Sequence, residues 1–208
     1  MSKPCRIMIV DDHFVVRSGI KASLEMEDDL EVITEAEDAA TAIDEFARHH
    51  PDLVLLDFQL PDKDGSAIVT ELLQLDPEAR ILMFSTYDRE EDIFQAIQAG
   101  ALGYILKSVP RDELLYAVRT IAAGERYLSP GVSQRLASRL ASPELSAREL
   151  EIIALVAKGQ SNKQIGSELG IAEDTVKRHV SNCLLKLKVN DRAQAATEAI
   201  RRGLIKVD

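Results

Sequence analysis

Cysteine is scarce in this sequence, because Cys5 and Cys183 are the only two among 208 residues. They lie far apart and form no CxxC pair, so we expect reduced thiols rather than a disulfide framework. The sequence also lacks a cluster of cysteine and histidine with the spacing of a metal site. It has no run of roughly 20 apolar residues and no basic segment followed by a long apolar stretch at its start. These absences predict a cytoplasmic protein that does not enter a membrane.

Positive charge is scarce in the first part of the chain. Residues 1–124 contain 11 Lys+Arg and 25 Asp+Glu, a net charge of −14, whereas residues 125–208 contain 14 and 10, a net charge of +4. An acidic domain suits a divalent cation and repels nucleic acid, while a basic domain can neutralise phosphates. Because this length also suits two domains, we expect two domains with different partners.

Short apolar runs alternate with longer segments of helical periodicity in the first part. The runs predict strands at 5–10, 30–35, 53–57, 80–85 and 102–106. The periodic segments predict helices at 14–26, 38–49, 65–75, 90–99 and 110–122. Such alternation is typical of a doubly wound α/β domain, here a five-stranded parallel sheet with helices on both faces.

The alternation stops after residue 124. Residues 125–143 read as a linker with turn-like ends, in which 132–140 can form a short helix. Beyond the linker the pattern predicts only helices, at 147–158, 162–169, 173–187 and 191–202. Ser146 and Glu149 have the spacing of a capping box at the start of the first of these helices. The sequence thus predicts an α/β domain at 1–124 and a small all-α domain at 144–208.

Three of the predicted strands end at charged residues. Asp11 and Asp12 follow the first strand, Asp57 ends the third and Lys107 follows the fifth. The carboxyl ends of parallel strands are where open α/β sheets bind ligands. An aspartate can carry a phosphoryl group if a divalent cation offsets the repulsion between the two anions, and Mg²⁺ prefers such hard oxygen ligands. Lys107 can stabilise phosphoryl oxygens as a compact charge.

These residues make the segment 5–122 resemble the receiver domain of bacterial two-component response regulators, which has a flavodoxin-like fold. The resemblance also includes the segments 60–65 and 103–107. It implies that Asp57 is the phosphoacceptor and that Lys107 pairs with the phosphoryl group. It further implies a Mg²⁺ site formed by Asp12, Asp57 and the backbone carbonyl of Gln59, with Asp11 acting mainly through metal-bound water.

Two further residues resemble the switch pair of receiver domains. Ser85 ends the fourth predicted strand and Tyr104 lies in the fifth. The resemblance implies that the phosphate draws Ser85 inward and that Tyr104 occupies the vacated space. Plain core packing of Tyr104 is the alternative. His13 adjoins the acidic pair, and we expect it on the surface of the first helical turn, because imidazole prefers softer metals than Mg²⁺.

The second domain has the pattern of a helix-turn-helix, in which the second helix of the pair enters the major groove of DNA. The segment 144–206 resembles the LuxR-type DNA-binding domain through the motifs at 145–149, 159–165 and 175–180. The resemblance implies that the residues facing the base edges of DNA are Lys177, Arg178 and Ser181. It also implies contacts with DNA phosphates from Lys163, Thr175, Lys186, Lys188 and Arg192. A receiver joined to such a domain is typical of the NarL/FixJ class of response regulators.

The sequence therefore predicts a DNA-binding regulator of transcription, not an enzyme. We expect a sensor histidine kinase to phosphorylate Asp57. Phosphorylation should then release the helix-turn-helix domain, form a homodimer, or do both, and so control binding to double-stranded DNA. One alternative is a constitutive regulator whose receiver is only a dimerisation surface. Another is a Mg²⁺-dependent phosphohydrolase, but the DxD acid pair of haloacid-dehalogenase-type phosphatases is missing, because Gln59 stands two residues after Asp57.

Overall fold

The structure is a computed structural model that describes residues 3–141 and 143–205. Close contacts divide the chain into two compact units, Met1–Asp88 with Asp92–Arg135 and Arg89–Glu91 with Leu136–Asp208. No helix in the described part of the chain combines the length and the apolar character needed to cross a membrane.

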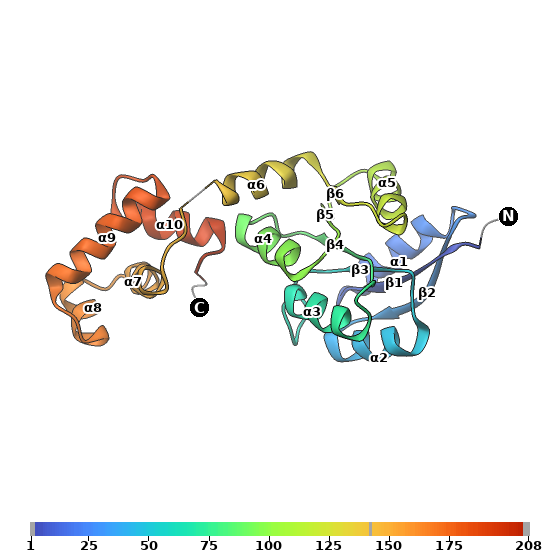
Figure 1. The fold of residues 1–208 in the computed structure, drawn as a ribbon, viewed down its shortest axis with the longest axis horizontal. Coiled ribbons are helices and arrows are strands. Elements are labelled where there is room, and N and C mark those ends of the chain that lie inside the picture. The colour runs from blue at the N-terminus through green and yellow to red at the C-terminus, as the bar shows by residue number, and fades with distance from the viewer. Residues whose placement is uncertain (1–2, 142, 206–208) are drawn as a thin grey trace. The chain divides into compact units, whose positions relative to one another are not determined.

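A parallel sheet with the strand order β2-β1-β3-β4-β5-β6 forms the centre of the first unit (Figure 1). Its strands are β1 (Cys5–Val10), β2 (Leu30–Ala36), β3 (Leu53–Leu56), β4 (Ile81–Ser85), β5 (Gly103–Leu106) and β6 (Tyr127–Leu128). The connecting helices are α1 (Phe14–Leu24), α2 (Ala39–His49), α3 (Gly65–Leu75), α4 (Glu90–Ala99) and α5 (Arg111–Ala122). Figure 1 shows α1 and α5 on one face of the sheet and α2, α3 and α4 on the other. This is the predicted doubly wound architecture.

The inner strands are buried on both faces. Every residue of β3 and β4 is buried, and the side chains of α1 and α5 pack on one face of the sheet. Because helices cover both faces, these strands do not alternate between apolar and polar residues but form continuous apolar runs. That is why their positions agree with the sequence prediction to within one or two residues.

The prediction of five strands was wrong, because the sheet has a sixth strand inside the predicted linker. In β6, Tyr127 pairs with Gly103 and Leu128 with Tyr104, both in β5. Gly103 permits this close approach, since a Cβ there would lie 2.6 Å from the Tyr127 carbonyl oxygen. A strand of two residues is too short to show a hydrophobic period. The helix that follows, α6 (Pro130–Leu140), contains the predicted 132–140 and begins two residues earlier.

The second unit contains the helices α7 (Ala147–Ala157), α8 (Asn162–Leu169), α9 (Glu173–Leu187) and α10 (Arg192–Arg202). The capping box predicted at α7 is confirmed, because Ser146 and Glu149 bond each other's backbone amides. A left-handed Gly170 ends α8, and the Ile171 amide donates to the Gly166 carbonyl at 2.9 Å. A Cβ on Gly166 would lie 2.7 Å from the Ile171 oxygen, so this glycine lets the turn between α8 and α9 close tightly.

Candidate functional site

The acidic residues and Lys107 meet where the strands of the first unit end. Asp57 follows β3 directly, and its amide still donates to the Val10 carbonyl of β1 at 2.8 Å. The Lys107 amide continues the ladder between β5 and β4 by donating to the Ser85 carbonyl at 2.8 Å. These backbone bonds set the positions of the Cα atoms of Asp57 and Lys107. The register of the sheet therefore brings the charged side chains together at one edge, as the sequence predicts.

Lys107 holds two buried carboxylates. Its Nζ lies 2.6 Å from Asp11 Oδ2 and 2.6 Å from Asp57 Oδ2. Asp11 and Asp57 are only 1% and 4% exposed, so their charges depend on this cation. Burial raises the pKa of Asp57, and Lys107 opposes the rise without cancelling it. Burial lowers the pKa of Lys107, but its hydrogen bonds to Asp11 and Asp57 outweigh that effect and leave the pKa raised.

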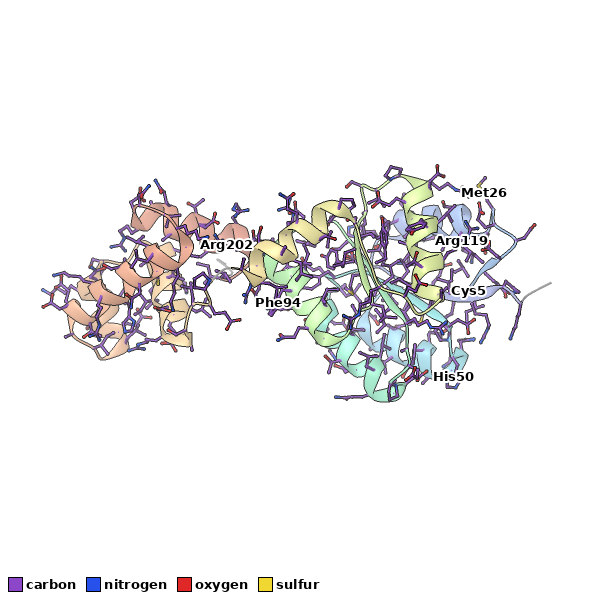
Figure 2. All side chains as sticks on the ribbon, turned by 45° about the horizontal axis from the view of Figure 1, so that its top comes forward. Cys5, Met26, His50, Phe94, Arg119 and Arg202 are labelled. Atoms are coloured by element: carbon purple, nitrogen blue, oxygen red, sulfur yellow. The ribbon has the colours of Figure 1, made fainter. Side chains whose placement is uncertain are left out.

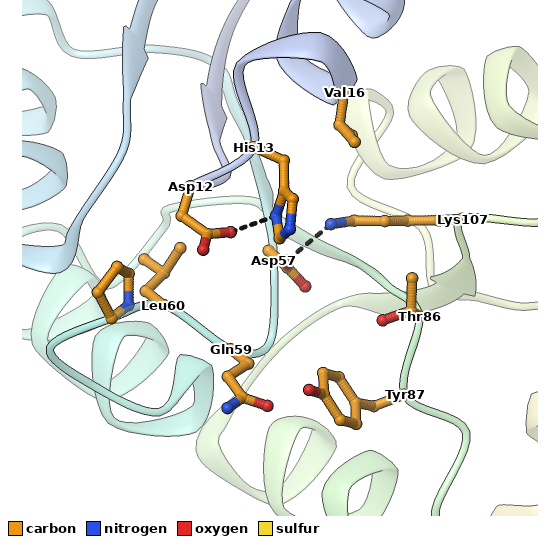
Figure 3. Close-up of a pocket in the computed structure, with 10 residues that line it drawn as sticks. Asp12, His13, Val16, Asp57, Gln59, Leu60, Thr86, Tyr87 and Lys107 are labelled. Carbon is orange, nitrogen blue, oxygen red and sulfur yellow. Dashed lines mark hydrogen bonds and ion pairs between the residues drawn. The ribbon is translucent and has the colours of Figure 1, made fainter.

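A cavity of about 420 Å³ opens beside these groups. Figure 3 shows its lining, which includes Asp12, Asp57, Gln59 and Thr86. Asp57 Oδ1 is buried and has no hydrogen-bond partner among the described residues, although its other oxygen bonds Lys107. A buried carboxylate oxygen without a partner is costly unless a cation or a proton donor reaches it. Carboxylate and carbonyl oxygens are the ligands that Mg²⁺ prefers, so these residues fit that ion.

The loop after Asp57 is tied to the neighbouring helix. The Asp62 carboxylate accepts from the Ala39 amide at 3.0 Å and from the Ala40 amide at 3.4 Å, at the start of α2. A Cβ on Gly65 would lie 2.8 Å from Phe58 Cα, so a glycine lets α3 begin against this loop. Both contacts fix the path of the backbone that carries Gln59.

Two further residues, Arg17 and His13, make contacts at the site that the sequence does not predict. The Arg17 guanidinium donates to the Asp11 carbonyl at 2.5 Å. The two residues are not three or four apart on one helix, so their spacing in the sequence does not predict this contact. His13 is exposed, as predicted, but its Nδ1 also lies 2.6 Å from Asp12 Oδ1. Its backbone amide donates to Asp11 Oδ1 at 2.9 Å, which the adjacency of the two residues in sequence made possible.

Ser85 and Tyr104 lie behind the cavity rather than on its wall. Both are fully buried, and neither is among the residues that line the cavity. The Tyr104 hydroxyl donates to the Tyr87 carbonyl at 2.7 Å, and the Tyr87 amide donates to Ser85 Oγ at 3.1 Å. Tyr104 is thus connected to the segment that follows β4, while its role as a switch residue stays a prediction.

A second cavity, of about 490 Å³, lies at the opposite ends of the strands. Figure 2 labels Cys5, His50 and Arg119 around this end. Two arginines at this cavity have protein partners: Arg6 donates to the His50 carbonyl at 2.9 Å, and Arg119 donates to Asp29 at 2.7 Å and 2.8 Å. These arginines hold loops and helices in place by contacts within the protein. The candidate site is therefore the cavity at the carboxyl ends of the strands.

In the second unit, α9 exposes the predicted base-facing residues. Lys177, Arg178 and Ser181 are exposed, whereas Val176 and Cys183 of the same helix are buried in the core of this unit. Lys163 and Lys188 are exposed and Thr175 is half-buried. One face of α9 therefore packs into the core, and the opposite face is free to contact another molecule.

Two of the predicted phosphate contacts have partners within the unit. Lys186 Nζ lies 2.7 Å from Glu149 Oε2 and donates to the Glu144 carbonyl at 2.9 Å. Arg192 donates to the Gln160 carbonyl at 2.5 Å. Any contact of these two cations with phosphate would compete with those bonds.

The two units match two known families in chain order. Residues 7–119 match response regulator receiver domains, and residues 143–199 match bacterial regulatory proteins of the luxR family. Transcriptional regulatory protein DegU of Brevibacillus brevis is 36% identical over 97% of this chain and 95% of its own length. Transcriptional regulatory protein LiaR of Bacillus subtilis is 37% identical over 96% of this chain and 99% of its own length.

A solved structure agrees with these matches. The response regulator ChrA of a heme-sensing two-component system is 38% identical, with a TM-score of 0.59 over 98% of this chain and 100% of that one. The family matches have the same order, receiver first and luxR-type domain second, and the relatives match over nearly their full length. The chain therefore belongs to the two-component response regulators, with a receiver domain and a LuxR-type DNA-binding domain, and is a regulator of transcription.

Proposed function

We propose that Asp57 stores a phosphoryl group taken from a sensor histidine kinase and that this modification controls DNA binding by α9. The observation that carries the proposal is the environment of Asp57. Its carboxylate is 4% exposed and lies beside a cavity of about 420 Å³. One oxygen bonds Lys107, and the other is buried without a hydrogen-bond partner in the part of the chain that the structure describes. An oxygen held ready in this way can attack phosphorus as the phosphorus–nitrogen bond to the kinase histidine breaks.

The chain's own residues prepare this step. Lys107 neutralises part of the charge of Asp11 and Asp57 and is placed to pair with oxygens of the incoming phosphoryl group. Mg²⁺ would be held by Asp12, Asp57 and the Gln59 carbonyl, with Asp11 acting through water, and would offset the repulsion between carboxylate and phosphate. Thr86 and Tyr87 line the cavity and limit its size on the side opposite Asp12.

The phosphoacceptor is tested with Mg²⁺ and a small phosphodonor, with mass and DNA affinity measured in one sample. The wild-type chain should gain one phosphoryl group and change its affinity for a DNA site selected from a random pool. Asp57→Asn should do neither, because the amide cannot form the acyl phosphate. Asp28→Asn removes an exposed carboxylate elsewhere and should behave as the wild type. DNA binding that is the same with and without phosphodonor would instead favour a constitutive regulator.

We propose that the DNA surface consists of Lys163, Thr175, Lys177, Arg178, Ser181 and Lys188. Lys186 and Arg192 are weaker candidates because both bond protein carbonyl groups and Lys186 also bonds a carboxylate. A homodimer would place two such surfaces about one turn of DNA apart, roughly 34–36 Å.

Lys177→Ala tests this surface. Because a side chain that bonds a base edge contributes about 1–3 kcal/mol, the variant should bind the selected site roughly 5- to 150-fold more weakly. Lys158→Ala removes an exposed lysine at the end of α7, outside the proposed surface, and should change affinity much less. Equal losses in the two variants would mean that Lys177 contributes only general charge.

A further inference from the structure

The second cavity of the receiver, at the amino ends of the strands, has mainly positive charge on its wall. It has a volume of about 490 Å³, and Cys5 and Arg119 lie beside it (Figure 2). The charged side chains that line it are four cations and two carboxylates, namely Lys3, Arg6, Arg80, Arg119, Asp29 and Asp52. Residues 1–124 together have a net charge of −14. The cavity therefore has the opposite sign of charge from the domain that contains it.

The register of the sheet brings these side chains together. Asp29, Asp52 and Arg80 directly precede β2, β3 and β4. The Cys5 amide donates to the Asp29 carbonyl at 2.8 Å, and the Val54 amide donates to the Arg80 carbonyl at 2.8 Å. These backbone bonds extend the parallel ladders to the first residues of the strands. The position of the cavity is therefore set by the sheet.

Both carboxylates of this cavity already have partners. Asp29 accepts two hydrogen bonds from Arg119, at 2.7 Å and 2.8 Å, and these bonds lower the pKa of Asp29. Asp52 accepts from the Arg6 backbone amide at 2.8 Å. Of the four cations, only Arg119 is thus neutralised by a carboxylate of the cavity wall.

The other three cations have no carboxylate partner in the part of the chain that the structure describes. The Arg6 guanidinium donates to two backbone carbonyls at the end of α2, at 2.8 Å and 2.9 Å. The Arg80 guanidinium donates to the Ala122 carbonyl at 2.5 Å, which uses one of its five N–H donors. Lys3 is exposed, and its ammonium group bonds no described residue. Neutral carbonyl groups leave the charges of the two arginines uncompensated.

We propose that this cavity binds a small polyanion through phosphate or carboxylate groups, with Arg80 and Lys3 as contacts and Arg6 adding charge. Guanidinium donors match the oxygens of either group, and an anion between the cations offsets their mutual repulsion. The volume lies within the range of small-molecule sites, about 300–1,000 Å³. The site lies at the ends of the strands remote from Asp57, so the inference does not rest on the proposed function.

The test measures the binding of citrate and of inorganic pyrophosphate to the full chain by calorimetry, without divalent cations and at constant ionic strength. Citrate presents carboxylates and pyrophosphate presents phosphates, so the tighter probe identifies the group that the cavity prefers. Arg80→Gln should weaken the tighter probe at least about tenfold, because hydrogen bonds between charged groups are among the strongest. Arg126→Gln removes an exposed cation outside the cavity and should bind both probes as the wild type does.

Cys5 reports directly whether the anion occupies the cavity. It lines the cavity and is half-buried, whereas Cys183 is fully buried. Burial raises the pKa of Cys5 to about 11, so its alkylation by iodoacetamide is slow and is followed at a pH of about 9. Peptide mass spectrometry should show slower alkylation of Cys5 with the tighter probe than with chloride at equal ionic strength. Arg80→Gln should remove this protection.

Lys3→Gln is a second variant whose fold does not depend on the substituted side chain. Because Lys3 is exposed, the substitution should weaken the tighter probe by up to about fivefold. Failure of both probes to bind the wild type would overturn the inference. Equal affinities of the wild type, Arg80→Gln and Lys3→Gln would overturn it as well, as would alkylation of Cys5 that neither probe slows.

Discussion

At the scale of single residues, the phenol of Tyr104 connects β5 to the segment after β4. The ring is fully buried, and its hydroxyl donates to the Tyr87 carbonyl at 2.7 Å. Burial raises the pKa of Tyr104, with hydrogen bonding to Ser85 acting in the opposite direction, so the hydroxyl stays a donor throughout the physiological range. The buried hydrogen bond holds Tyr87, which lines the cavity beside Asp57.

Tyr104→Phe should lower the free energy of unfolding of the receiver by about 1–2 kcal/mol, because it removes one buried hydrogen bond and keeps the ring. Urea unfolding followed by circular dichroism measures this change. Tyr116→Phe is the control, since Tyr116 is 61% exposed and should change the free energy by less than about 0.5 kcal/mol. Equal effects of the two substitutions would show that the Tyr104 hydroxyl does not stabilise the fold.

At the scale of elements, a partly buried ion pair joins the start of α7 to the end of α9. Glu149 is 3% exposed, caps α7 through Ser146, and lies 2.7 Å from Lys186 Nζ. Burial acts to raise the pKa of Glu149, but the hydrogen bonds from Lys186 and Ser146 outweigh it and lower the pKa below its ordinary value of 4.5. A carboxyl whose pKa is lowered by folding stabilises the fold above its unfolded-state pKa.

The Glu149→Gln variant should therefore be less stable than the wild type at pH 7, by about 1–3 kcal/mol. The difference should shrink as the pH falls from the ordinary value of 4.5 through the lower pKa of the folded state, because the wild-type carboxylate is then protonated. Urea unfolding at a series of pH values measures it. Glu151→Gln changes a more exposed acid of the same helix and should show little pH-dependent loss. A difference that is constant down to the lowest pH would contradict this ion-pair account.

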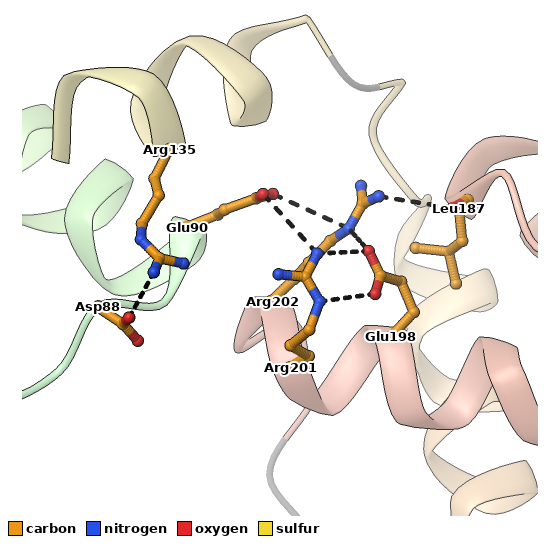
Figure 4. A network of polar contacts seen from close by, with 7 residues as sticks. All are labelled: Asp88, Glu90, Arg135, Leu187, Glu198, Arg201 and Arg202. Atoms are coloured by element: carbon orange, nitrogen blue, oxygen red, sulfur yellow. Dashed lines mark hydrogen bonds and ion pairs between the residues drawn. The ribbon is translucent and has the colours of Figure 1, made fainter. Parts of the chain in front are cut away.

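At the scale of the whole molecule, the chain that follows α5 stays part of the receiver unit as far as Arg135, within α6. Leu128 pairs with Tyr104 across β6 and β5, and Val132 of α6 is fully buried. Figure 4 shows Arg135 of α6 directed at Asp88, and the atoms lie 2.5 Å apart. The ion pair thus joins the segment after β4 to α6, the helix that precedes the DNA-binding domain. In that domain, Figure 4 also shows Glu198 between Arg201 and Arg202, contacts that fasten the last turn of α10.

Arg135→Ala should reduce the difference in DNA affinity between the phosphorylated and unphosphorylated chain. The ion pair is partly exposed and worth no more than about 1 kcal/mol, so the reduction should not exceed roughly fivefold. Asp88→Ala should have the same effect, and the double variant no larger one. Arg126→Ala removes an exposed cation of the same segment and serves as control. Additive effects of the first two variants would show that the pair does not act as one unit.

Much of the fold and of the candidate site could be predicted, for reasons that particular residues illustrate. The strand residues just before Asp11, Asp57 and Lys107 are mostly buried, so they form short apolar runs that a sequence displays directly. The contacts of Arg17 with Asp11 and of Asp62 with α2 could not be predicted, because they join residues with no fixed spacing in the sequence. The strand β6 depends on pairing with Gly103 and leaves no periodic signal of its own.

The sequence by itself determined the family, the order of the two domains, and the residues that gather at the carboxyl end of the sheet, because each follows from local pattern or motif. Only the tertiary structure decided which of those residues touch. It placed Lys107 on one oxygen of Asp57 and left the other without a hydrogen-bond partner among the described residues. Such contacts depend on how the strand ends and loops pack together in space. The distance between two such atoms cannot be read from the order of residues alone.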